Sequence, residues 1–281
     1  NVFVGGYDGI LYAVALDDSG GLKELKWRKR VGGSIVGSPV VDGGLVLVGS
    51  SDGNMYAFDV VEGREEWRFT TSGKVWSTPL VVDGVVYFGS IDGNVYAVGL
   101  EDGQEIWKFR AKGAVAASPL LDGDRLYIGS FGSVFYAINA RTGLLIWQFD
   151  QADSWFWGRA VVADEVVYAP SLDGNLYALS KKTGDLRWVV KTEGAIASSP
   201  VIVHDMVAVA SDDGKVRLVR SRDGLELDFC DIREKIRSSL VESNGFIYFG
   251  AQDGSIRALR IKANGNPDDV WVRFTEKGVP E

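Results

Sequence analysis

Gly89-Ser90-Ile91-Asp92-Gly93-Asn94-Val95-Tyr96-Ala97 contains a pattern that recurs along the whole chain. Copies of this Gly/Ala-x-x-Asp-Gly-x-x-Tyr-Ala run follow one another about every forty residues, and seven can be aligned. The aromatic position is Tyr12, Tyr56, Tyr96, Tyr136, Tyr177, then Arg217 and Arg257, with spacings of 44, 40, 40, 41, 40 and 40. Such a period is typical of repeat architectures, in which one unit cannot bury its apolar face alone and packs on its neighbours.

Each repeat predicts four short strands. Within residues 73–112 the expected strands are Val75–Val82, Val85–Gly89, Asn94–Val98 and Glu105–Phe109. Six of the seven copies carry Asp-Gly at the second turn, and the exception is Gly132-Ser133. Asp-Gly between two β-rich runs favours a type I′ hairpin, which needs positive φ at both central positions. No segment shows sustained apolar spacing at the helical period, so we expect almost no helix.

Four antiparallel strands with polar turns, repeated radially, make the blades of a β-propeller. The sequence predicts an all-β protein, a β-propeller of four-stranded antiparallel blades in a single domain over residues 1–281. A partial blade is expected at 1–30 and full blades at about 31–72, 73–112, 113–153, 154–193, 194–233 and 234–281. Residues 274–281 stop where a first strand should begin, which leaves two interpretations. The ring has seven blades, which we favour, or eight in a longer natural chain.

A second column marks the fourth strand: Trp27, Trp67, Trp107, Trp147, Trp188, then Asp228 and Trp271. In most copies a glycine stands four residues before the tryptophan, as Gly143 does before Trp147. The run from Ala137 to Trp147 resembles the tryptophan-docking motif of quinoprotein (PQQ-type) propellers. The resemblance covers essentially the whole chain, and it differs from the WD40 pattern because no Trp-Asp dipeptide closes the strands.

That resemblance implies several functions. The family includes quinoprotein alcohol dehydrogenases, which bind pyrroloquinoline quinone and calcium, and the propeller lipoprotein of the outer-membrane β-barrel assembly machine. It also includes extracytoplasmic sensor domains of some kinases. The dehydrogenases are implied to have long insertions and, in many members, a vicinal Cys-Cys disulfide, whereas this chain has Cys230 alone. We therefore expect no enzyme activity, no cofactor and no metal, and keep quinone and calcium binding as the alternative.

Candidate ligand residues come from the first strands, which line the channel of a propeller. One column is apolar in each copy and is expected to pack between blades: Ile35, Val75, Val115, Phe156, Ile196 and Ile236. The other face is mostly small, and its large departures are Lys74, Trp76, Trp155, Trp157, Arg159, Lys235 and Arg237. Cationic and aromatic groups together can bind a planar anion or an acidic peptide. The alternative is that these side chains plug the channel.

The serines and threonine before proline, in Ser38-Pro39, Thr78-Pro79, Ser118-Pro119 and Ser199-Pro200, invite a nucleophile hypothesis. A hydroxyl repeated in most blades is better explained by a bond to a neighbouring backbone, because nucleophilic catalysis needs a paired base. The single histidine, His204, falls in a predicted turn. Neither feature indicates catalysis.

Composition narrows the partners. The net charge of −8 and pI near 4.9 disfavour nucleic acid, which needs a basic face. The absence of an 18-residue apolar run predicts no membrane span. Because the chain begins at Asn1 in a strand, we expect a signal peptide or membrane anchor, if the protein has one, outside these residues.

The sequence therefore favours a non-catalytic binding or scaffold propeller outside the cytoplasm, in the periplasm or at the cell surface. Its expected partner is a protein or peptide on a loop face or at the channel mouth. Two alternatives stay open: a quinoprotein dehydrogenase-like cofactor binder, and a carbohydrate-binding propeller whose tryptophans stack on sugars. The excursions Asp17–Gly21 and Lys262–Pro267 are further candidate surface features.

Overall fold

The computed structural model describes residues 1–261 and 267–274, the latter segment by its backbone only. Residues 262–266 of the second predicted excursion, and residues 275–281 at the predicted closure, lie outside the described residues. The side chain of Trp271 does too. Over the described ranges the secondary structure is strand and turn, with no helix, and hence none that could cross a membrane.

The strands form seven consecutive antiparallel sheets. The first has three strands, β1 (Val2–Gly5), β2 (Ile10–Leu16) and β3 (Leu22–Arg30). The second sheet contains β4 (Val40–Asp42), β5 (Leu45–Gly49), β6 (Asn54–Asp59) and β7 (Glu65–Thr70). The third contains β8 (Leu80–Val82), β9 (Val85–Gly89), β10 (Asn94–Gly99) and β11 (Glu105–Arg110). The fourth contains β12 (Leu120–Asp122), β13 (Arg125–Gly129), β14 (Phe135–Asn139) and β15 (Leu145–Phe149).

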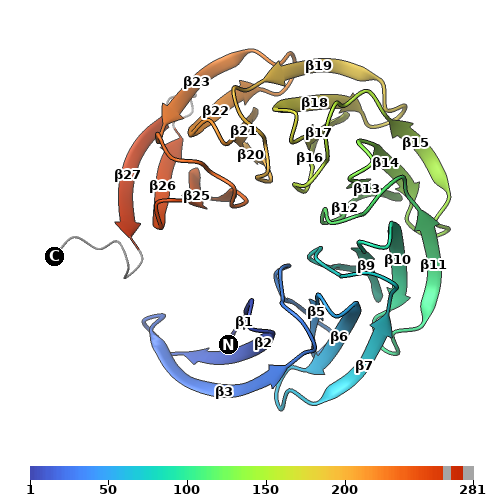
Figure 1. Cartoon of the computed structure of the whole chain (residues 1–281). Coiled ribbons are helices and arrows are strands. Elements are labelled where there is room, and N and C mark those ends of the chain that lie inside the picture. The colour runs from blue at the N-terminus through green and yellow to red at the C-terminus, as the bar shows by residue number, and fades with distance from the viewer. Residues whose placement is uncertain (262–266, 275–281) are drawn as a thin grey trace. The chain divides into compact units, whose positions relative to one another are not determined.

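The last three sheets repeat the same order. They are β16 (Val161–Ala163), β17 (Val166–Pro170), β18 (Asn175–Ser180) and β19 (Leu186–Lys191); β20 (Val201–Val203), β21 (Met206–Ala210), β22 (Lys215–Arg220) and β23 (Glu226–Asp231); and β24 (Val241–Ser243), β25 (Phe246–Gly250), β26 (Ser255–Ile261) and β27 (Pro267–Phe274). Figure 1 labels most of these strands. The prediction of an all-β propeller with seven blades, one of them three-stranded, is confirmed.

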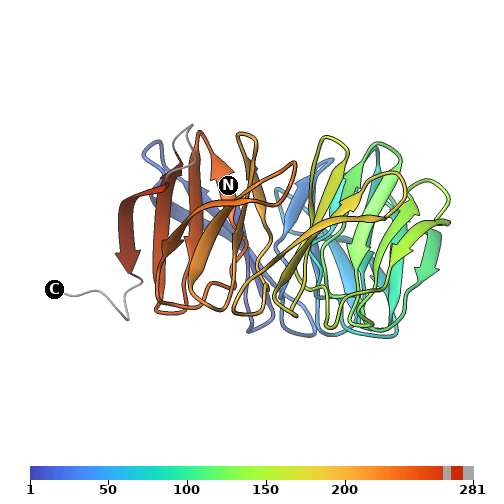
Figure 2. The ribbon, with the colours of Figure 1, turned by 90° about the horizontal axis from the view of Figure 1, so that it is seen from above.

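The chain falls into two compact units, and their division runs through the sheet β12–β15. The first unit comprises residues 1–126, 130–132 and 138–145, and the second comprises 127–129, 133–137 and 146–281. The expectation of a single domain stays a prediction. In the second unit, strands β24–β26 run between turns at two opposite ends, as Figure 2 shows. Because neighbouring strands are antiparallel, the turns after the first and third strands share one end of a sheet.

The tryptophan column joins each sheet to the next within a unit. A Cβ added to Gly143 would lie 2.8 Å from Trp107 Cδ2, so the indole lies directly on that glycine. The indole N–H of Trp107 donates to the carbonyl of Ala140 at 2.9 Å, and Trp67 donates in the same way to Leu100 at 2.8 Å. In the second unit Trp147 donates to Lys181 at 3.0 Å. Burial of these rings, with Trp107 only 8% exposed, contributes about 3–5 kcal/mol each.

The apolar column packs between sheets as predicted. Val75, Val115, Phe156, Ile196 and Ile236 are fully buried, and Ile35 nearly so. A Cβ on Gly89 would lie 2.4 Å from Val115 Cγ1, and one on Gly49 would lie 2.6 Å from Val75 Cγ1, so the second strands of these repeats have to end in glycine. The core of each unit therefore lies between its sheets as well as within them.

The predicted length of the first strand is wrong. Residues 75–79 were expected to be strand, but β8 contains only Leu80–Val82. The preceding segment bonds to two repeats instead of one ladder: the Val75 amide donates to the Ser50 carbonyl, and the Lys74 carbonyl accepts from the Ile91 amide. Apolar and polar residues alternate in this segment because its apolar side chains pack between sheets. The alternation has the same two-residue period as a β-strand, and the sequence pattern therefore predicted a strand.

The predicted type I′ geometry of Asp92-Gly93 is also wrong. Gly93 has φ +86°, but Asp92 is not in the left-handed region. Both positive φ values occur at the first turn instead, where Asp83 has +50° and Gly84 +74°. At the second turn the aspartate has a different role, because its carboxylate accepts the amides of Asn94 at 2.9 Å and, from the preceding repeat, Ser72 at 3.0 Å.

The hydroxyl column before proline bonds to neighbouring backbone, as expected. The Ser38 amide donates to Thr78 Oγ1 at 2.9 Å, and the Thr78 amide donates to Ser118 Oγ at 3.0 Å. In the second unit the Arg159 amide donates to Ser199 Oγ at 3.0 Å. These hydroxyls link adjacent repeats, and this structural role accounts for their recurrence.

Candidate functional site

The seven predicted site residues fall in both units, two in the first and five in the second, so they form two separate sets. In the first unit Lys74 Nζ lies 5.3 Å from the ring centroid of Trp76, within cation–π distance. The indole N–H of Trp76 donates to Ser51 Oγ at 3.0 Å. Lys74 is exposed and Trp76 half-buried, and a shallow hollow of about 210 Å³ lies beside Lys74, Ser51 and Asp52.

In the second unit Arg237 is held by a carboxylate that the sequence reasoning missed. Its guanidinium makes a forked contact with Asp212, with Nη2–Oδ2 at 2.6 Å and Nε–Oδ1 at 2.9 Å. This hydrogen bond and the charge of Asp212 raise the pKa of Arg237. Because an anion would have to compete with Asp212, Arg237 presents less positive charge than its sequence position implied.

Two of the other four residues are placed by backbone hydrogen bonds in which their carbonyls accept. The Trp155 carbonyl accepts the Leu172 amide at 2.8 Å, and the Lys235 carbonyl accepts the Gln252 amide at 3.0 Å. The Trp155 side chain is 46% exposed. Trp157 is half-buried.

Arg159 is exposed at the surface, yet the protein atoms around it lower the pKa of its guanidinium by desolvation.

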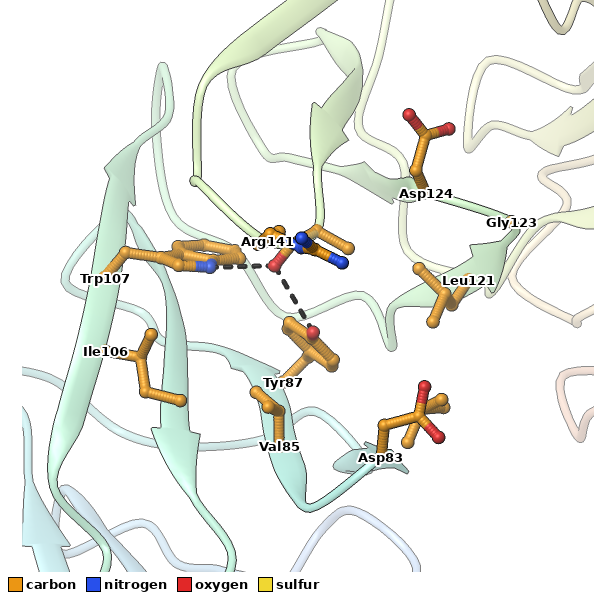
Figure 3. Close-up of a pocket in the computed structure, with 11 residues that line it drawn as sticks. Asp83, Val85, Tyr87, Ile106, Trp107, Leu121, Gly123, Asp124 and Arg141 are labelled. Carbon is orange, nitrogen blue, oxygen red and sulfur yellow. Dashed lines mark hydrogen bonds between the residues drawn. The ribbon is translucent and has the colours of Figure 1, made fainter.

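A pocket in the first unit was not predicted from the sequence. It has a volume of about 390 Å³ and opens between the sheets β8–β11 and β12–β15, beside the turns that follow first and third strands (Figure 3). Its walls are largely apolar and include Val85, Ile106 and Leu121. Its charged lining residues are Asp83, Asp124 and Arg141.

The aromatic side of the pocket is fixed by one carbonyl. Tyr87 Oη donates to the carbonyl oxygen of Ala140 at 3.3 Å, and the Trp107 indole donates to the same oxygen at 2.9 Å (Figure 3). Burial, followed by the charge of Asp83, raises the pKa of Tyr87, so its hydroxyl stays protonated at neutral pH. Because the Tyr87 hydroxyl and the Trp107 indole N–H both donate to this carbonyl, the two rings present mainly apolar carbon atoms to a bound group.

A small residue at one position of the repeat accompanies the pocket. The corresponding position is Leu100 in the preceding repeat, where the side chain is 7% exposed and would meet a Cβ on Gly43 at 3.1 Å. In the repeat that forms the pocket, Ala140 replaces this leucine. A comparison of Val60, Leu100 and Ala140 along the repeat would have indicated the space.

Quinone and calcium binding stays an alternative that the structure does not test. Within residues 1–261 no three His, Cys, Asp or Glu side chains come together in a way that could hold a metal ion. The paired cysteines that the dehydrogenase resemblance implies are also missing, because Cys230 is the single cysteine of the chain.

One family of known proteins matches this chain in three overlapping segments. The family model described as outer membrane protein assembly factor BamB matches residues 1–76, 73–154 and 130–267. The chain belongs to this family. A search of curated proteins found no match.

Solved structures support the fold. The crystal structure of BamB from Moraxella catarrhalis matches with a TM-score of 0.80 and 21% identity, over 98% of this chain and 82% of that one. The computationally designed Ika8 protein matches with a TM-score of 0.72 and 19% identity, over 83% of this chain and 72% of that one. At these identities the likeness establishes the propeller fold, and function has to be argued separately.

Proposed function

We propose that this chain is a non-catalytic scaffold that binds protein partners outside the cytoplasm, at the cell envelope, during assembly of outer-membrane proteins. The observation that carries the proposal is the match of the BamB assembly-factor model, whose three segments together span residues 1–267. Membership of the family supports a role in assembly more than one in catalysis. The rigid turns between short strands suit such a role, because recognition is usually carried by loops on a fixed scaffold.

For the contact surface we propose the two sets of predicted residues, Lys74 with Trp76, and Trp155, Trp157, Arg159, Lys235 and Arg237. The exposed ring of Trp155 favours this assignment, since exposed aromatic side chains are enriched where proteins meet. A peptide carboxylate could pair with Lys74 or Arg159 by charge-assisted hydrogen bonds.

The test is made in the source organism. Cells that lack the gene should contain less folded β-barrel protein in the outer membrane than wild-type cells, and the intact gene should restore the amount. An unchanged amount of each outer-membrane protein would contradict the proposed role. For the quinone alternative, a stoichiometric chromophore after incubation with pyrroloquinoline quinone and calcium would replace our proposal with cofactor binding.

A further inference from the structure

The pocket beneath Ala140 is a built feature, because the structure supplies both the space and the means of keeping it. Tyr87 and Trp107 are 5% and 8% exposed, and both donate to the Ala140 carbonyl. Two hydrogen bonds to one fixed backbone oxygen hold the rings in place, so the space is not available to them. Ala140 itself is too small to fill it.

Its size suits a side chain more than a cofactor. About 390 Å³ is near the lower end of the range of small-molecule sites, roughly 300–1,000 Å³. The pocket is open: Ile106 on one wall is 52% exposed, and the Asp124 side chain on the rim is 75% exposed. An open apolar pocket with charged groups at its rim resembles the anchor sites at which one protein receives a side chain of another.

The rim offers one carboxylate to a cation, because Arg125 lies beside Asp124 whereas no ion pair of Asp83 is seen among the described residues. Asp83 and Asp124 contribute two carboxylates against the guanidinium of Arg141. Asp124 lies 3.8 Å from Arg125 Nε, so Asp83 is the main anchor for an incoming positive group. The net charge of −8 on the whole chain adds attraction for a basic partner at long range.

We propose that this pocket receives an aliphatic or aromatic side chain from a segment of a partner protein, with a neighbouring Lys or Arg of that segment against Asp83. The inference rests on the proposed function, because it takes the occupant of the pocket to be part of a partner protein. It is separate from the set formed by Lys74 and Trp76, because the pocket lies by the turns after first and third strands, at the other end of the sheets from the segment that carries these two residues.

Binding can be tested with matched peptides on the whole chain. The probe is acetyl-Gly-Leu-Lys-Gly-amide, and its controls replace Leu with Ser or Lys with Gln. Titration to about 10 mM, where even weak single-anchor contacts become visible, is followed through the methyl signals of Ile106 and Leu121. The Leu-Lys peptide should shift these signals saturably, the Ser-Lys peptide should not, and the Leu-Gln peptide should bind about two- to fivefold more weakly.

Variants assign the contact to the pocket. Ala140→Leu should weaken the Leu-Lys peptide at least about tenfold by filling the space as Leu100 does in the preceding repeat. Asp83→Asn, an exposed change that leaves packing intact, should remove the preference for Lys over Gln. Glu101→Gln is the control, because Glu101 is an exposed carboxylate in the turn after the third strand of the repeat that carries Asp83, and it does not line the pocket. It should leave binding unchanged.

The proposal is overturned if no saturable shift occurs, or if Ala140→Leu binds the Leu-Lys peptide as well as the natural chain does. Failure here is distinguishable from failure of the proposed function. If deleting the gene lowers folded outer-membrane protein and Ala140→Leu restores it fully, the scaffold role stands and the pocket has no part in it. If the Leu-Lys peptide binds but deletion has no effect, the pocket is real and the assembly role is wrong.

Discussion

The third repeat (residues 73–112) and the sixth (194–233) use the same aspartate with different partners. Asp92 accepts the hydroxyl of Tyr96 at 2.8 Å and the amide of Ser72 at 3.0 Å. Asp213 accepts the guanidinium of Arg217 at 2.7 Å and the amide of Glu193 at 3.0 Å. In both repeats one carboxylate oxygen bonds to the preceding repeat. The comparison shows that this link is the constant feature, and that either Tyr or Arg can hold the carboxylate in place.

The electrostatics of the two repeats differ. Burial, then the hydrogen bond to Asp92, raises the pKa of Tyr96 to about 12. Burial alone would raise the pKa of Asp213, but the hydrogen bonds from Arg217, Ser211 and two backbone amides lower it to about 2. The third repeat therefore keeps a neutral donor, whereas the sixth keeps a buried ion pair with side chains 5% exposed.

The largest loss of stability is expected at the tryptophan position, where the third repeat has Trp107 and the sixth has Asp228. Trp107→Ala should lower the free energy of unfolding by about 3–5 kcal/mol, because it empties a buried site over Gly143. Asp228→Ala, the same position in the sixth repeat, should cost less than about 1 kcal/mol, since Asp228 is half-buried and bonds locally to the Phe229 amide. Urea denaturation measures both. Equal losses would show that the sixth repeat depends on this position as much as the third does.

The ion pair of the sixth repeat is expected next. Arg217→Ala leaves Asp213 buried without its cation and should cost about 3 kcal/mol. Arg257→Ala is the control, because the Arg257–Asp253 pair is more exposed, at 14% and 20%, and should cost about 1 kcal/mol. A loss at Arg217 no greater than that at Arg257 in urea denaturation would contradict the contribution of burial.

Much of this fold could be predicted because the repeat aligns chemically equivalent residues. The second and third strands of the third repeat (residues 73–112), for example, lie where the pattern predicted them. The first strand could not be bounded, because Val75 alternates with its neighbours for contact between sheets and not for pairing. The turn type at Asp92-Gly93 was missed because hairpin statistics are local, whereas Asp92 is held by Ser72 of another repeat.

The site was less predictable for the same reason. Unusual residues in a column indicated Lys74, Trp76 and Arg237, but a column does not reveal Asp212 beside Arg237. The pocket is lined by the small side chain of Ala140. In an alignment of the repeats, a small residue is a less conspicuous departure than a large or charged one. Its significance appears only when Ala140 is set against Leu100.

The lowered pKa of Asp213 in the sixth repeat predicts how the stability of the protein changes in acid. Its pKa in the folded state, about 2, is below the ordinary 3.8, so its contribution is complete above pH 4 and is lost as the pH falls towards 2. The difference corresponds to about 2 kcal/mol. The natural chain should therefore lose that much more stability than Asp213→Asn between pH 4 and pH 2, measured by urea denaturation. Parallel curves for the two proteins would contradict the depressed pKa.

The smallest effect is expected at the turn that lacks Asp-Gly. Ser133 has φ +60°, in the region that costs a non-glycine residue roughly 1–2 kcal/mol. Ser133→Gly relieves this strain but adds freedom to the unfolded chain, worth about 0.5–1 kcal/mol. The net gain should be about 0.5–1 kcal/mol in thermal or urea unfolding. A loss of stability would show that the serine side chain makes a compensating contact.

The central claim is that contacts supplied by the motif join each repeat to the next. A double-mutant cycle on Trp107→Ala and Gly143→Ala, measured by urea denaturation, tests it most directly, because these residues come from adjacent repeats and lie in contact. With Trp107 present, a Cβ at Gly143 meets the indole at 2.8 Å; without it, only the cost of φ +70° remains. We predict a coupling energy of at least about 1 kcal/mol. Losses that add to within about 0.5 kcal/mol would contradict the claim.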